Sequence, residues 1–147
     1  MKWLLLPLAL LLPYALFAQP ANDACGEAIA VTPNGSCVTG TTVAATDGWI
    51  GTVGCAGNNP EVWYSFVATG SQLDVNITSG TLGGNIEFIL VEALAPCLGL
   101  TLYSSICAAS PIVQTLSLSL TPGNLYYYTI SSTGAAGTFT ACINSYD

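Results

Sequence analysis

The sequence predicts an all-β protein: an antiparallel β-sandwich of about eight or nine short strands, jelly-roll or immunoglobulin-like, stapled by disulfides. Several segments alternate apolar and polar residues with period two, the pattern of a strand that buries one face. Glycine and proline separate these segments, and no amphipathic helical run stands out between them. The chain also has six cysteines, an even number that favours three disulfides in an exported protein.

Eight or nine segments are expected to form the strands. The clearest is 112–120, where Leu116, Leu118 and Leu120 alternate with hydroxyl side chains. Segment 85–93 is more uniformly apolar, as in a strand that is buried on both faces. In chain order, the expected strands are 28–32, 37–43, 61–66, 72–79, 85–93, 100–106, 112–120, 126–130 and 137–144.

A local motif supports the sandwich. Residues 120–126 have the form L-x-P-G-x-x-Y, which is typical of a tyrosine corner, in which the hydroxyl of Tyr126 folds back onto upstream backbone. The strand that follows places Tyr126 and Tyr128 on one face and Tyr127 on the other. Tyr127 is therefore the tyrosine of this strand that remains a candidate for a surface role.

The N-terminus is predicted to be a signal peptide, residues 1–18. One lysine precedes an apolar run at 3–12, and small residues lead to Ala18. The run is too short to span a bilayer, and no second candidate for a transmembrane segment follows. Residues 19–147 are expected to form a single sandwich domain that is secreted and associated with the cell surface.

Charge limits the functions that remain. The chain has eight acidic residues, one basic residue and no histidine, and the basic residue is Lys2, in the predicted signal peptide. Nucleic-acid binding is excluded because no cation remains to neutralise phosphates. Without histidine or lysine the usual acid–base and nucleophilic pairs are missing. A pair of carboxylates, Glu87 and Glu92, would face opposite sides of one strand. We therefore predict that the protein is not an enzyme.

The cysteines are expected to be structural rather than metal ligands, since the sequence has no CxxC pair. Sequence proximity favours Cys97–Cys107 and Cys37–Cys55, which leaves Cys25–Cys142 to tie the N-terminus to the last strand.

Three aromatic residues are candidates for stacking against a sugar. In strand geometry Trp63 points away from Val62 and Tyr64, while Trp49 lies in a loop rich in glycine and asparagine, and Tyr127 is the third. We expect no cofactor. Calcium is the ion considered, because oxygen-bearing residues surround Trp49, but their spacing matches no known calcium loop. These residues are Asp47, Asn58, Asn59 and Glu61.

The assembled motifs resemble a module of exported proteins of Bacteroidota. The pattern runs through N-D-x-C-x-x-A-I at 22–29, D-V-W-Y-S-F at 61–66 with Glu61 in place of Asp, L-x-P-G-x-x-Y-Y at 120–127 and a closing G-T-F-T stretch before Cys142. Such modules are similar to pre-peptidase C-terminal-like β-sandwiches. The resemblance implies an accessory, non-catalytic role. A calcium role is not carried over, because alanines follow Cys107 where many relatives have acidic residues.

Two functions remain at this point. One is a non-enzymatic structural or adhesive protein that partners with itself, as the subunit of a surface filament or matrix. Its support is a neutral surface of Ser, Thr and Gly with few charges to desolvate when copies pack together. The alternative is a carbohydrate-binding module that recognises surface glycans through Trp49, Trp63 or Tyr127.

Overall fold

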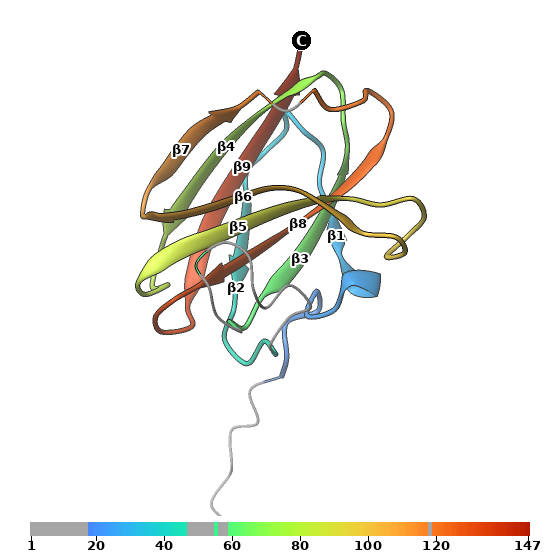
Figure 1. Ribbon diagram of the computed structural model, residues 1–147. Helices are drawn as coiled ribbons and strands as arrows, with labels where there is room; N and C mark the ends of the chain where they lie inside the picture. The colour runs from blue at the N-terminus through green and yellow to red at the C-terminus, as the bar shows by residue number, and fades with distance from the viewer. Residues whose placement is uncertain (1–17, 47–54, 56–58, 118) are drawn as a thin grey trace, which may run out of the picture.

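A computed structural model describes residues 18–46, 55, 59–117 and 119–147. One 3-10 turn and nine strands occur among them (Figure 1). The predicted signal peptide lies outside the described residues except for Ala18. The elements are η1 (Cys25–Glu27), β1 (Ile29–Ala30), β2 (Val38–Thr41), β3 (Val62–Val67), β4 (Gln72–Ser79), β5 (Asn85–Glu92), β6 (Thr101–Ala109), β7 (Ile112–Leu116), β8 (Leu125–Ser132) and β9 (Thr138–Tyr146).

The strands form two sheets that pack as a sandwich, as predicted. One sheet has the order β1-β3-β8-β5-β6 and the other the order β2-β9-β4-β7. In Figure 1, β5 and β6 run across β4 and β9 of the other sheet. The pairing is antiparallel except between β1 and β3, which are parallel. The short β1 enters the sheet beside β3 without a hairpin, which explains this exception to the predicted antiparallel pairing.

The core lies between the sheets and is rich in aromatic rings. Alternate side chains of β3 and β8 point inward, so that Val62, Tyr64 and Phe66 lie in the core together with Tyr126 and Tyr128. The Tyr64 and Tyr128 rings stack with their centroids 5.1 Å apart, and Phe88 lies 5.3 Å from Tyr128. Such ring pairs stabilise a fold beyond the area that they bury.

The outer face of the five-stranded sheet is also covered. A second buried cluster consists of Trp63, Ile89, Val91 and Tyr127, and side chains from η1 and from the loop after β5 pack against it. Strand β5 is therefore buried on both faces, as its uniform apolar composition predicts.

The turn before β8 has the arrangement that the tyrosine-corner motif predicts. The Tyr126 hydroxyl accepts a hydrogen bond from the Thr121 N–H at 3.0 Å and donates one to Glu92 Oε1 at 3.3 Å. Gly123, at φ 88°, supplies the left-handed residue that the turn needs.

The strand predicted at 112–120 is shorter in the structure. β7 ends at Leu116, and Ser119 has a φ of 55°, a left-handed conformation that does not continue a strand. Leu120 is buried in the core nevertheless, whereas Leu118 lies outside the described residues. Alternation predicted the burial of Leu120 but could not locate the bend.

All three predicted disulfides are wrong. The bonds observed are Cys25–Cys97, Cys37–Cys142 and Cys55–Cys107, which join residues 72, 105 and 52 positions apart. Sequence proximity is the basis for the predicted Cys37–Cys55 and Cys97–Cys107 pairs, and Cys25–Cys142 is predicted only because it remains. Strand pairing instead brings distant residues together: Val38 lies opposite Ala141 in the β2–β9 ladder, which places the preceding Cys37 beside Cys142.

Candidate functional site

The stacking candidates that the structure describes do not face solvent. Trp63 is only 2% exposed, and its backbone is clamped by Asn22, whose Nδ2 donates to the Trp63 carbonyl and whose carbonyl accepts from the Trp63 N–H, both at 2.8 Å. Tyr127 is 5% exposed and lies opposite Ser65 and Val91 in the ladders. With so little of either side chain exposed, neither ring offers an open face on which a sugar could stack. Trp49 lies outside the described residues.

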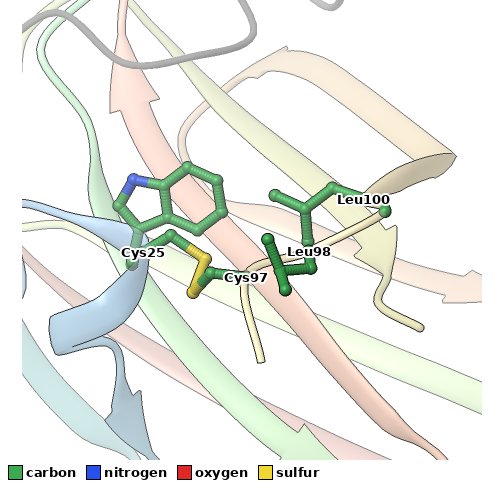
Figure 2. Close-up of a pocket in the computed structure, with 6 residues that line it drawn as sticks. Cys25, Cys97, Leu98 and Leu100 are labelled. Carbon is green, nitrogen blue, oxygen red and sulfur yellow. A yellow bond between two sulfur atoms is a disulfide. The ribbon is translucent and has the colours of Figure 1, made fainter. Parts of the chain in front are cut away.

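A pocket of about 360 Å³ lies above Trp63. Its wall includes the Cys25–Cys97 disulfide together with Leu98 and Leu100, which lie beside one another in Figure 2. The lining side chains offer an indole N–H but no hydroxyl, amide or carboxylate. A sugar bound there would lose the hydrogen bonds of its hydroxyls to water without replacement.

The buried Glu87 is a structural anchor. Its carboxylate accepts hydrogen bonds from Cys55 N–H at 2.8 Å, Ser131 Oγ at 2.7 Å and Asn59 Nδ2 at 3.4 Å. Hydrogen bonds to a charged acceptor are stronger than neutral ones, and here they fix the position of Cys55 against the sheet.

Glu87 and Glu92, both within the described residues, do not come together as a catalytic pair. Glu92 accepts hydrogen bonds from Tyr126 and Asn124. Glu87 accepts one from Ser131 on the opposite face of the same sheet. The two carboxylates therefore serve separate networks, as their spacing in one strand predicts.

Of the calcium ligands considered, Asp47 and Asn58 lie outside the described residues. Asn59 donates to Glu87, and Glu61 is buried. Within the described ranges, no group of three or more acidic, cysteine or histidine side chains could hold a metal ion. The absence of a cofactor stays a prediction.

A polar site that the sequence analysis did not single out lies on the outer face of the four-stranded sheet. The ladders place Asp74 of β4 between Thr115 of β7 and Asn144 of β9, with Asn76 in the adjacent row. A depression of about 220 Å³ opens there, and the polar side chains that line it on this face are those of Asp74, Asn76, Thr115 and Asn144.

The Asp74 carboxylate is held in a fixed orientation. Thr115 Oγ1 and the Tyr146 hydroxyl both donate to its Oδ1, at 2.6 Å and 3.0 Å. Alternation in 72–79 marks Asp74 and Asn76 as outward-facing residues. Their neighbours come from strands 41 and 72 positions away, so no local pattern could have revealed the cluster.

No helix among the described residues is long and apolar enough to cross a membrane. No protein-family model matches the chain, and no curated protein matches it in sequence.

Three solved structures are similar in fold. The pre-peptidase C-terminal domain of a collagenase from Bacillus anthracis aligns over 80% of this chain and 94% of its own, with 14% identity and a TM-score of 0.52. The Yersinia pseudotuberculosis-derived mitogen aligns over 76% of this chain and 86% of its own, with 14% identity and a TM-score of 0.48. The surface-associated copper-binding protein CorA of Methylomicrobium album BG8 aligns over 80% of this chain and 98% of its own, with 8% identity and a TM-score of 0.47. The first of these supports a sandwich similar to that of pre-peptidase C-terminal domains.

Proposed function

We propose that this chain is a non-enzymatic extracellular structural or adhesive subunit that associates with copies of itself through the edges of its sheets. The observation that carries the proposal is the distribution of charge among the strands. The edge strands β1, β2, β6 and β7 contain no charged residue, whereas the charged strand residues, Asp74, Glu87 and Glu92, lie on the interior strands β4 and β5.

This distribution is the reverse of the usual protection of a sheet edge. Soluble proteins commonly keep edge strands short or place charges on them, because an unprotected edge presents unpaired N–H and C=O groups to another chain. Strand β6 has nine residues, pairs only with β5 among the strands that the structure describes, and leaves Leu102 and Ser105 exposed. It is long enough to accept a partner strand over several hydrogen bonds.

The two sides of the sandwich are suited to repeated association. The chain passes from β6 into β7 through Ser110 and Pro111, so both edge strands lie on one side. The edge strands β1 and β2, which are likewise consecutive, lie on the other. A contact between unlike sides leaves one open side, with two edge strands, at each end of the assembly. Such contacts generate filaments rather than closed dimers.

Extracellular location is supported by the predicted signal peptide and by three disulfides, which persist in oxidising compartments. A non-enzymatic role is supported by the lack of histidine in the sequence and by the structural use of Glu87 and Glu92.

A charge placed on the edge tests self-association. In Ser105→Lys on β6 or Thr39→Lys on β2, pairing would force an ammonium group against a neighbouring strand. We expect sedimentation velocity and negative-stain electron microscopy to show multimers for the wild type and monomers for both variants. Ala136→Lys is the matched control, because it adds the same charge to the exposed turn between β8 and β9. A wild type that stays monomeric at high concentration, or edge variants that associate like the control, would contradict the proposal.

A further inference from the structure

The outer face of the four-stranded sheet carries a second function. We infer that the depression around Asp74 and Asn76 binds a sugar unit of a neutral glycan. This site is distinct from the aromatic residues considered from the sequence. Asp74, Asn76 and Asn144 lie on the interior strands β4 and β9, and only Val113 and Thr115 come from the edge strand β7. It stands independently of the proposed self-association.

The chemistry of the lining fits sugar hydroxyls. Each hydroxyl both donates and accepts, and it is best matched by side chains that together do both. Asn76 and Asn144 each offer an amide donor and a carbonyl acceptor, and both side chains are exposed. Asp74 adds a charged acceptor, which makes stronger hydrogen bonds than a neutral one.

The Asp74 carboxylate is preorganised for a ligand. Both of its protein donors, Thr115 and Tyr146, use Oδ1, and within the described residues no hydrogen bond is made to Oδ2. A hydroxyl of a bound sugar can therefore donate a hydrogen bond to Asp74 Oδ2 without displacing a protein donor. Since the carboxylate is already oriented, little rotamer entropy is lost when it binds.

An apolar surface for the carbon face of the ring lies beside these polar groups. Val113 lines the depression and is 73% exposed, although it sits in a strand where its neighbours Ile112 and Leu116 are buried. The volume of about 220 Å³ is below the roughly 300 Å³ at which pockets for drug-sized ligands begin, which suits one sugar ring rather than a longer enclosed segment.

Charge selects against acidic glycans. The sequence holds eight acidic residues, and its one basic residue lies in the predicted signal peptide. A uronic acid or a sulfated sugar would bring its anion to Asp74 with no cation nearby, and like-charge contacts of this kind disfavour binding. The expected ligand is therefore neutral, such as a hexose or N-acetylhexosamine unit.

Affinity electrophoresis of the secreted protein tests this inference. The gels contain soluble β-glucan, mannan, galactomannan or glycol chitin as neutral probes, and polygalacturonate or hyaluronan as acidic ones. We expect retardation by at least one neutral polysaccharide and by neither acidic one. Asp74→Ala and Asn76→Ala should each weaken that retardation at least tenfold. Thr78→Ala, exposed on the same face of β4 but outside the depression, should leave it unchanged.

Thermal unfolding of each variant shows whether the fold is kept. Asn76 is exposed, so its substitution keeps the test valid if Asp74→Ala is unstable. The inference is overturned by retardation in acidic gels alone, by no retardation in any neutral gel, or by full retardation of Asn76→Ala. A second copy of the chain as the true occupant would show itself as altered sedimentation of Asn76→Ala with unchanged retardation, which also overturns it.

Discussion

Tyr128 carries a buried hydroxyl that has no hydrogen-bond partner within the described residues. Burial raises the pKa of this hydroxyl far above its ordinary value, with a further contribution from the neighbouring Tyr64. An unpartnered buried polar group costs free energy that a phenyl ring would not. We therefore expect Tyr128→Phe to raise the free energy of unfolding, measured in guanidinium chloride, by about 1 kcal/mol.

Tyr126→Phe is the matched comparison, since it removes a hydroxyl that is bonded. The Thr121 N–H loses its acceptor and Glu92 loses a donor, so we expect this change to lower the free energy of unfolding by about 1–2 kcal/mol. Equal effects of the two substitutions would show that the Tyr128 hydroxyl is satisfied in solution.

The face of the strand on which many side chains lie could be predicted from the sequence. Period-two alternation placed Trp63 on the opposite face from Val62 and Tyr64, and separated Tyr127 from Tyr126, as the two buried clusters show. Alternation could not show that the outer face of the same sheet is covered. That cover depends on η1 and the loop after β5, which lie far apart in the sequence and meet at the Cys25–Cys97 bond.

At the scale of elements, each of the nine segments predicted as strands contains a strand in the structure. The wrong predictions concern which cysteines are bonded to each other. Strand order in the sheets is not sequential, so β2 pairs with β9 and β3 with β8. The disulfides and the Asp74 cluster both follow from these non-local ladders. A single sequence carries no signal for such pairings, because alternation fixes a face but not a neighbour.

The Cys37–Cys142 bond ties β2 to the last strand across 105 positions. In the loop-entropy model, a closed loop of this size lowers the conformational entropy of the unfolded chain. This stabilises the folded state by about 4–5 kcal/mol. We expect Cys37→Ser/Cys142→Ser to lose about that much free energy of unfolding, measured in guanidinium chloride.

The connectivity itself is checked on the wild type. Mass spectrometry of a digest kept under non-reducing conditions should yield the peptide pairs 25 with 97, 37 with 142, and 55 with 107. A peptide that joins Cys25 to Cys142 would contradict this connectivity, because Cys142 could then not be bonded to Cys37, which lies beside it at the end of the β2–β9 ladder.

At the scale of the whole molecule, the edges and the outer face of the four-stranded sheet can act together. The proposed edge pairing would occupy backbone groups at the sides of the sandwich, β7 included, and would leave the side chains on the outer face around Asp74 open. Each subunit of an assembly would then present one sugar site. Repeated sites on one particle engage a polysaccharide with an avidity well above the affinity of a single site.

This combination predicts different behaviour with short and long glycans. Ser105→Lys, which blocks the β6 edge, should leave the affinity for a neutral trisaccharide unchanged in isothermal titration calorimetry, because the sugar site is intact. It should weaken retention on the matching polysaccharide by roughly 10²-fold or more, since linked sites gain about 10²–10⁴ from effective concentration. Asp74→Ala should lose both activities and still form multimers. Equal retention of wild type and Ser105→Lys on the polysaccharide would show that the subunit binds glycans singly, and that edge association contributes nothing to adhesion.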